Sequence, residues 1–392
     1  AAAVFAARAQ APEPVAESFP APAASATPAT PAAPSLAADL REAVSHLPVT
    51  VKDLYGREET RSITLTSFRP PGDGPFPLVV MNHGRAPAVR RAAQGRQRYE
   101  ALARYLVSKG FAVLVPTRVG YSETYGDFDP ESTGECQRMR PQAAAQAVTD
   151  QVLAVLAHAK TLPWVDARRW VVMGQSMGGF TAIAVTAHNL PGLVAAINFS
   201  GGTGGNPELR PGNPCSPQAV GALWKSLASG ARVPMLWLYW QNDHYWGPDV
   251  PRQWAQDWRD GGGEVEFHQF EPTGAEGHQG LVSDMDHWVP RVEDWLSRAC
   301  FPRSGVVPRP PASDFARVAE IDKVPLPPAV RQRLYTRFLD AAKPRAFAIG
   351  PDGQAGYATG DWALGKALGF CQARRGGPCR LYAVDDDVVW VP

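Results

Sequence analysis

The chain lacks several features that would assign it to other classes of protein. No apolar run approaches the roughly 18 residues that a membrane-spanning helix needs. The 39 Lys and Arg nearly balance the 38 Asp and Glu, leaving a net charge of +1, so no nucleic-acid partner is expected. None of the five cysteines forms a C-x-x-C pair, so no zinc or other metal site is predicted. With 45% hydrophobic residues, the chain can still bury a substantial core.

The N-terminus has the composition of a processed export signal. It begins A-A-A-V-F-A-A-R-A-Q-A without a methionine, and Ala9-Gln10-Ala11 fits the small-x-small pattern of a signal-peptidase site. We interpret residues 1–11 as a signal-peptide remnant, with an Ala-rich tail as the alternative. The sequence therefore predicts a periplasmic or secreted protein.

Two stretches that cannot bury a core divide the chain. Residues 12–37 are mostly Ala, Pro, Ser and Thr, which is typical of an extended linker. Residues 302–313 form a second, Pro-rich linker. We predict a large domain over 38–301 and a small C-terminal α+β domain of unknown role over 314–392.

The large domain alternates predicted strands and helices. Short runs of β-branched and apolar residues indicate strands, and apolar residues at helical spacing indicate helices. Such alternation predicts an α/β fold with a doubly wound, mostly parallel sheet, whose active site lies at the carboxyl ends of the strands. Strands are expected at 49–54, 61–68, 78–81, 111–115, 170–173, 193–199, 235–239 and 264–270, and helices at 99–109, 142–160, 180–188 and 288–298.

A serine in the run G-Q-S-M-G-G is the candidate nucleophile. The pattern around Ser176 is weak by itself, because composition produces it in about one such chain in seven. Here it joins an apolar strand to a helix, which is the context of a nucleophile elbow. Gly174 and Gly178 remove side chains that would clash in the strained turn. The alternative is a small residue in a structural turn.

A serine nucleophile needs a base to take its proton and a carboxylate to orient that base. On this type of sheet the chain order is serine, acid, histidine. Asp243 directly follows an apolar strand and is the predicted acid. His278 lies in the Gly-rich loop after the last strand and is the predicted base. Weaker candidates are Asp249, Asp284 and Asp286 for the acid and His287 for the base.

The oxyanion of the transition state needs preorganised N–H donors. The backbone N–H of Met177, beside the candidate nucleophile at the start of a helix, is one predicted donor. The other is the backbone N–H of Arg85, which follows the run N-H-G, because Gly84 lets the backbone approach closely. The residues predicted to line the substrate pocket are His83, Tyr121, Tyr245 and Trp246. The polar loop Gly120–Arg140 either lines the pocket or is a solvated surface loop.

The cysteines predict two disulfide bonds if the protein is exported. Cys371 and Cys379 flank the turn-rich loop R-R-G-G-P, and Cys136 and Cys215 both lie in long loops. Because the count is odd, one thiol remains, and we expect it to be Cys300. The alternative is that all five cysteines are reduced.

Taken together, these motifs resemble the α/β-hydrolases, and within them the dienelactone-hydrolase-like group of bacterial exported esterases. The resemblance covers about residues 45–300 and implies hydrolysis through Ser176, Asp243 and His278 without a cofactor. The matching segments are N-H-G at 82–84, P-T-R-V-G-Y-S at 116–122, V-D-A-R-R-W-V-V-M-G-Q-S-M-G-G at 165–179, V-P-M-L-W-L-Y at 233–239, Q-N-D-H-Y at 241–245 and G-H-Q-G at 277–280.

The chain departs from the resemblance at the nucleophile. The dienelactone hydrolases that give the group its name use a cysteine, whereas this chain has Ser176. We therefore expect a small-molecule carboxylic ester as substrate, cleaved through an acyl-enzyme intermediate. The alternatives are a serine peptidase of the prolyl-oligopeptidase type and a non-catalytic binding protein of the same fold.

Overall fold

The computed structural model describes most of the chain beyond the N-terminal linker. The predicted signal remnant, nearly all of the first linker and Cys300 lie outside the described residues. None of the helices in the described part is long and apolar enough to cross a membrane. The described residues are 36–299, 301, 309–360, 363–372 and 378–392.

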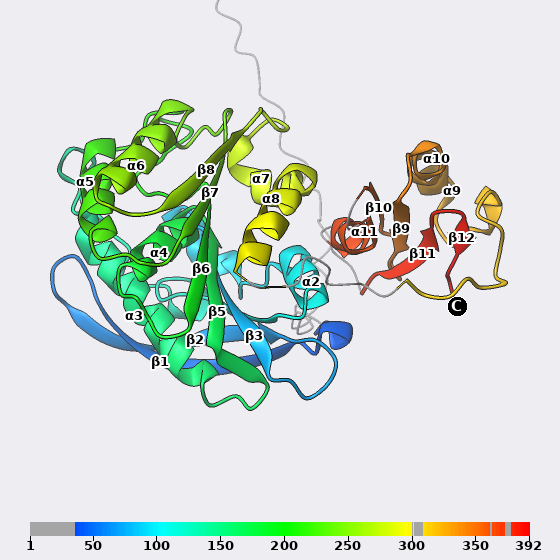
Figure 1. Ribbon diagram of the computed structural model, residues 1–392, viewed down its shortest axis with the longest axis horizontal. Coiled ribbons are helices and arrows are strands. Elements are labelled where there is room, and N and C mark those ends of the chain that lie inside the picture. Colours follow the sequence, from blue (N-terminus) through cyan, green and yellow to red (C-terminus); the bar gives the residue numbers. More distant parts are fainter. Residues whose placement is uncertain (1–35, 300, 302–308, 361–362, 373–377) are drawn as a thin grey trace, which may run out of the picture. The chain divides into compact units, whose positions relative to one another are not determined.

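An eight-stranded sheet forms the centre of the large unit (Figure 1). Its strands are β1 (Ala43–Lys52), β2 (Glu58–Phe68), β3 (Phe76–Asn82), β4 (Ala112–Pro116), β5 (Val165–Gln175), β6 (Leu193–Phe199), β7 (Met235–Trp240) and β8 (Val265–Phe270). Their spatial order is β1-β2-β4-β3-β5-β6-β7-β8. β2 pairs antiparallel with β1 and β4, and every other neighbouring pair is parallel. The predicted mostly parallel α/β sheet is confirmed.

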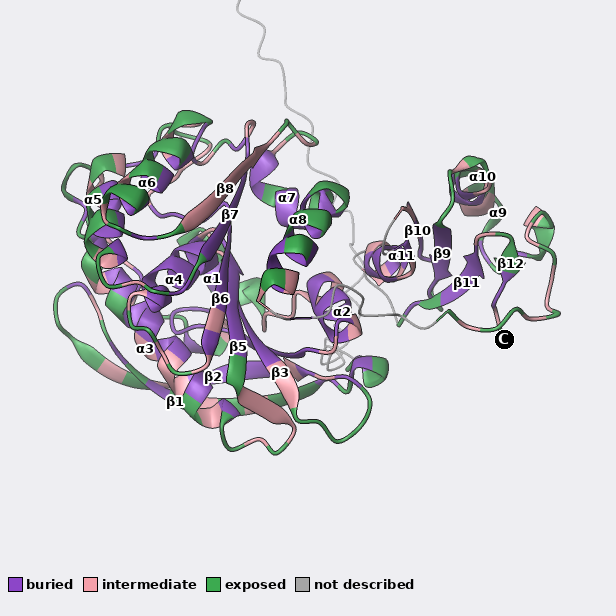
Figure 2. Cartoon of the chain, in the orientation of Figure 1, coloured by how far each residue is buried: buried purple, intermediate pink, exposed green. Residues whose placement is uncertain are grey.

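Helices cover both faces of this sheet, as a doubly wound fold requires. Along β5, Val171 and Met173 pack into the core under one face, whereas Trp170 and Val172 pack into the core under the other. Because both faces are covered, the central strands contain continuous apolar runs. β3, β4, β6 and β7 are mostly buried, and β5 is buried over its second half, residues 170–175 (Figure 2). The helices are α2 (Glu100–Ser108) and α8 (Met285–Arg298) on one face, and α3 (Pro141–Ala159), α4 (Met177–Thr186), α5 (Pro217–Ala228) and α6 (Asp249–Asp260) on the other.

The C-terminal unit is built on a separate antiparallel sheet. A cluster of aromatic side chains, among them Tyr335, Phe338, Phe347 and Tyr382, fills one of its cores. A four-stranded antiparallel sheet with a packed helix fits the predicted α+β class. Its elements are α9 (Pro328–Val330), α10 (Thr336–Asp340), β9 (Arg345–Ile349), β10 (Ala355–Thr359), α11 (Ala363–Gln372), β11 (Arg380–Val384) and β12 (Asp387–Val388), with strand order β10-β9-β11-β12.

Both predicted disulfide bonds are present. The sulfur atoms of Cys136 and Cys215 are 2.07 Å apart, and those of Cys371 and Cys379 are 2.01 Å apart. The first bond joins the loop that follows β4 to the loop that follows β6. Cys215 also donates its N–H to the carbonyl of Gly204 at 2.9 Å.

We expect alkylation of the folded, unreduced protein to add at most one group per chain. Four of the five cysteines are bonded, and a disulfide sulfur cannot act as the attacking thiolate. Intact-mass measurement before and after reduction tests this, because reduction should expose the other four. Modification of both Cys371 and Cys379 without reductant would contradict the second pairing.

Candidate active site

Ser176 occupies a strained turn between β5 and α4. Its backbone angles are φ 57° and ψ −120°, a region that costs a residue with a side chain about 1–3 kcal/mol. Two backbone hydrogen bonds hold the turn. The N–H of Ser176 donates to Phe199 O at 2.9 Å, and the carbonyl of Ser176 accepts from the N–H of Phe180 at 2.9 Å. The side chain is therefore fixed at the carboxyl end of a central strand, with part of its surface exposed.

Two glycines make the turn sterically possible. A Cβ on Gly178 would lie 1.9 Å from the carbonyl oxygen of Asn82, and a Cβ on Gly174 would lie 2.3 Å from the carbonyl carbon of Gly178. Both contacts are with backbone, which cannot move aside as a flexible side chain can. The glycines thus let α4 pack directly against the end of β3 and the end of β5.

We expect Gly178→Ala to lower the free energy of unfolding by about 3 kcal/mol or more, because the added methyl group collides with buried backbone. Urea unfolding followed by circular dichroism measures the change. Gly126→Ala is the matched control, since a Cβ there meets nothing within 4 Å. Equal stability of the two variants would show that the loop after β3 relaxes around the new side chain.

Asp243 and His278 lie together at the same edge of the sheet. Asp243 follows β7, and His278 lies in a short 3₁₀ turn, Gly277–Gln279, after β8. Asp243 Oδ2 and His278 Nδ1 are 2.9 Å apart, and both residues are buried. Because a carboxylate only accepts, Nδ1 carries the hydrogen, which leaves Nε2 able to take a proton.

The second oxygen of Asp243 fixes the orientation of the carboxylate. Oδ1 accepts the backbone N–H of Tyr245 at 2.8 Å and that of Trp246 at 3.3 Å. The ring of Tyr245 stacks on that of His278 with centroids 3.9 Å apart, and Trp246 meets it edge-on at 5.7 Å. The imidazole therefore has little freedom to rotate away from Asp243.

Gln175 connects the segments that carry the predicted site residues. Its Nε2 donates to the carbonyl of His278 at 2.8 Å, and its Oε1 accepts from the hydroxyl of Tyr99 at 3.2 Å. That hydroxyl accepts the N–H of Gly84 at 3.3 Å. Within the described residues no hydrogen bond joins Ser176 Oγ to His278, a contact that often forms only when substrate is bound. Neither Gln175 nor Tyr99 was among the site residues predicted from the sequence.

Ser176 faces a cavity of about 400 Å³. Met177, Arg85, Tyr245 and Trp246 line it together with Ser176. A Cβ on Gly84 would lie 3.3 Å from Ser176 Cβ, so the backbone before Arg85 lies close to the candidate nucleophile. Neither Met177 nor Arg85 donates its backbone N–H to another protein group in the described part of the chain. Both donors are thus available where a substrate carbonyl would lie.

The alternative base and acid lie elsewhere. His287 Nδ1 and Asp284 Oδ1 are 2.5 Å apart, but neither residue lines the cavity that Ser176 faces. Asp249 is an exposed residue at the start of α6. In the part of the chain that the structure describes, no group of three or more His, Cys, Asp or Glu side chains is arranged to hold a metal ion.

Residues 85–271 match the model of the dienelactone hydrolase family. The chain is a dienelactone-hydrolase-like α/β-hydrolase. The matched segment includes Ser176 and Asp243 and ends before His278. The family supports hydrolase activity for this dienelactone-hydrolase-like chain. No curated protein matches it significantly.

Several solved structures are similar to this dienelactone-hydrolase-like chain at low sequence identity. A putative dienelactone hydrolase from Klebsiella pneumoniae is 19% identical, with a TM-score of 0.42, covering 65% of this chain and 99% of that one. An esterase from Pyrococcus furiosus is 12% identical, with a TM-score of 0.44, covering 65% and 92%. An acylaminoacyl peptidase from Pyrococcus horikoshii is 17% identical, with a TM-score of 0.45, covering 67% and 42%.

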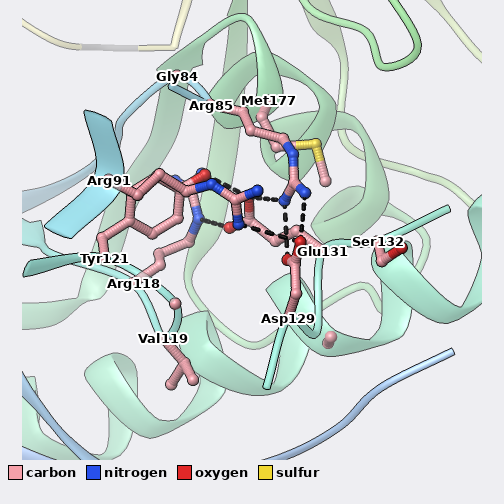
Figure 3. A network of polar contacts seen from close by, with 12 residues as sticks. Gly84, Arg85, Arg91, Arg118, Val119, Tyr121, Asp129, Glu131, Ser132 and Met177 are labelled. Atoms are coloured by element: carbon pink, nitrogen blue, oxygen red, sulfur yellow. Dashed lines mark hydrogen bonds and ion pairs between the residues drawn. The ribbon is translucent and has the colours of Figure 1, made fainter. Parts of the chain in front are cut away.

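His83 and Tyr121, which were predicted to line the substrate pocket, lie behind the cavity instead. His83 and Tyr121 are fully buried against each other, with ring centroids 4.5 Å apart, and neither lines the cavity. The loop Gly120–Arg140 is a surface loop over much of its length, with Glu123, Asp127 and Glu135 exposed. It does not line the cavity, and its residue Glu131 is buried in an ion network with Arg85 and Arg118 (Figure 3).

Burial changes the ionisation of the layer of residues behind the cavity, which includes His83 and Glu131. Burial and the nearby charge of Arg118 lower the pKa of His83 from 6.5 to about 3, so the imidazole is neutral at physiological pH. Burial by itself would raise the pKa of Glu131, but the charges of Arg118 and Arg85 outweigh it and lower the pKa to about 2. The layer thus holds the Glu131 carboxylate, the guanidinium groups of Arg118 and Arg85, and a neutral imidazole, and Arg85 also pairs with the carboxylate of Asp129.

The folded protein is expected to lose stability as the pH falls below 6.5. In this range the unfolded chain binds a proton at His83 that the folded chain does not bind until about pH 3, so protons favour unfolding. From pH 7 to pH 5 this residue should remove about 2 kcal/mol of unfolding free energy. Urea unfolding at both pH values measures it. If His83→Asn lost as much unfolding free energy between pH 7 and pH 5 as the wild type, the pH dependence would not come from His83.

Proposed function

We propose that this protein hydrolyses small-molecule carboxylic esters through a triad of Ser176, His278 and Asp243. The observation that carries the proposal is the strained Ser176, which faces the same cavity as Tyr245, while Tyr245 stacks on the imidazole of His278. The Asp243–His278 hydrogen bond supplies a base in the required tautomer. No cofactor takes part in the proposed reaction.

Acylation follows from this geometry. His278 Nε2 takes the proton of Ser176 Oγ, and Oγ attacks the ester carbonyl carbon. The backbone N–H groups of Met177 and Arg85 donate to the oxyanion that forms. When the tetrahedral intermediate collapses, His278 gives its proton to the leaving alcohol, and the acyl group remains on Ser176 as an ester.

Deacylation repeats these steps with water. His278 removes a proton from a water molecule, whose oxygen attacks the acyl carbon, and collapse releases the acid and returns the proton to Ser176 Oγ. Asp243 stabilises the imidazolium in both halves of the reaction without being protonated itself. Each group therefore returns to its starting state after one turnover.

We also propose that the protein works in an oxidising compartment, either the periplasm or the extracellular space. The support is the pair of disulfide bonds, because disulfides persist in such compartments and are rare in the reducing cytosol. Fractionation of the native host, followed by immunodetection, tests this. Recovery of the protein only in the cytosol would contradict it.

A matched pair of chromogenic substrates tests the ester assignment. We expect a short-chain p-nitrophenyl ester to be turned over rapidly and the p-nitroanilide of the same acid slowly or not at all. Comparable rates would favour the peptidase alternative. Saturable binding of the ester without turnover would favour the non-catalytic alternative.

A further inference from the structure

A buried ion network lies behind the cavity and takes no direct part in the proposed chemistry. The Glu131 carboxylate accepts from Arg118 Nε, from Arg85 Nη1 at 3.3 Å and from the hydroxyl of Tyr121 at 2.7 Å (Figure 3). The side chains of Glu131 and Arg118 are fully buried. Such a network is rigid only if its members stay paired, since an unpaired charge in this environment is costly. Arg118 is therefore fixed in one orientation.

Arg118 in turn fixes the tautomer of His83. Its backbone N–H points to His83 Nε2 at 3.0 Å, and its Nη1 donates to the carbonyl oxygen of His83 at 2.7 Å. An N–H can only donate, so Nε2 accepts and the ring hydrogen is on Nδ1. Nδ1 lies 2.7 Å from the carbonyl oxygen of Gly84 and donates to it.

That last hydrogen bond sets the orientation of a single peptide unit. The carbonyl of Gly84 and the N–H of Arg85 belong to the same planar group, which is not among the cis peptide bonds of the described chain. In a trans peptide these two bonds point in opposite directions. When His83 holds the carbonyl on the buried side, the N–H of Arg85 must point away from it.

The other side of this peptide is the cavity that Ser176 faces. Gly84 faces Ser176, since a Cβ added to it would lie 3.3 Å from Ser176 Cβ, and Arg85 lines the cavity. We propose that His83 is a positioning residue of the oxyanion hole, and that Glu131, through Arg118, holds His83 in the tautomer and place that this role requires. The proposal rests on the proposed function and adds the reason that one of its two oxyanion donors is preorganised.

A comparison of oxygen and sulfur esters separates positioning from general loss of structure. Replacing the ester carbonyl oxygen by sulfur makes the developing anion a poor hydrogen-bond acceptor, so a thionoester gains little from an oxyanion hole. Damage confined to the oxyanion hole therefore slows the oxoester and spares the thionoester. Loss of folded protein slows both equally.

The variants are His83→Leu, which removes the donor to Gly84, and Glu131→Gln, which keeps the size of the side chain. We expect His83→Leu to lower kcat for the oxoester about 100-fold, the size of effect seen when one oxyanion donor is lost. KM should stay nearly constant, and the oxoester-to-thionoester rate ratio should fall by a similar factor. Glu131→Gln should shift the ratio in the same direction, and His83→Asn, whose side-chain amide can still donate to Gly84, should restore most of it.

Glu293→Gln is the matched control. Glu293 is another buried carboxylate, paired with Lys109, but it lies on α8 and not in the network behind the cavity. The Glu293→Gln variant should be less stable than the wild type but should keep the wild-type oxoester-to-thionoester rate ratio. If His83→Leu does not fold, Glu131→Gln decides the question alone.

The outcomes distinguish the two proposals. Wild-type ratios in both His83→Leu and Glu131→Gln, together with an inactive Ser176→Ala, would overturn the positioning role and leave the proposed function intact. Full ester hydrolysis by Ser176→Ala would overturn the proposed function itself. A ratio that falls in the network variants and not in Glu293→Gln supports the positioning role.

Discussion

Ester hydrolysis by the Ser176→Ala variant is expected to be slower than wild type by a factor of about 10⁴ or more in kcat/KM. Without Oγ no acyl-enzyme can form, and only the oxyanion donors and substrate binding remain to accelerate direct attack by water. The measurement is p-nitrophenol release from a short-chain ester. Because the side chain is small and partly exposed, the fold should persist.

Ser229→Ala is the matched control for this experiment. Ser229 is an exposed residue at the end of α5 and should be replaceable without effect. A wild-type rate of ester hydrolysis in Ser176→Ala would show that Ser176 is not the nucleophile. Equal losses in both variants would indicate an effect on folding or preparation instead.

Asp243→Asn is expected to lower kcat by a factor of about 10³ to 10⁴ with the fold intact. In the wild-type protein the Asp243 carboxylate accepts from His278 Nδ1–H at 2.9 Å and balances the charge of the imidazolium that forms during each half-reaction. An amide has no negative charge, and its NH₂ group can select the imidazole tautomer in which Nε2 is protonated and cannot act as a base. Steady-state kinetics with the same ester measure the effect.

Asp249→Asn provides the comparison, because Asp249 was a weaker candidate for the same role and lies exposed on α6. Its substitution should leave kcat within about twofold, as is usual for surface changes far from a site. A large loss of kcat in Asp249→Asn together with a small loss in Asp243→Asn would assign the role of the acid to Asp249. Losses in neither would mean that His278 is oriented by another group.

The parts of the fold that the sequence predicted are those in which one physical cue dominates. The central strands are buried on both faces, so their residues form continuous apolar runs that are easily recognised. The helices α5 and α6 were not predicted. In α6 the buried positions Pro251, Trp254, Ala255 and Trp258 have the spacing of one helix face, so the sequence contained a helical signal there that the prediction missed.

The candidate site shows the same division. Ser176, Asp243 and His278 could be proposed from the sequence because each lies in the segment after a strand, in a characteristic chain order. The burial of His83 and the partners of Glu131 could not. Those contacts join loops after different strands, and the sequence around Glu131 reads as polar and solvated. Only the folded arrangement brings Arg85 and Arg118 to that carboxylate.

Covalent labelling tests the central claim most directly. The protein would be treated with an alkyl p-nitrophenyl phosphonate, a reagent that phosphonylates an activated serine, and then analysed by intact-mass measurement and peptide mapping. We expect one phosphonyl group per chain, attached to Ser176, with ester hydrolysis lost in proportion and no labelling of the Ser176→Ala variant. Labelling at a different residue, or continued ester hydrolysis after Ser176 is fully modified, would contradict it.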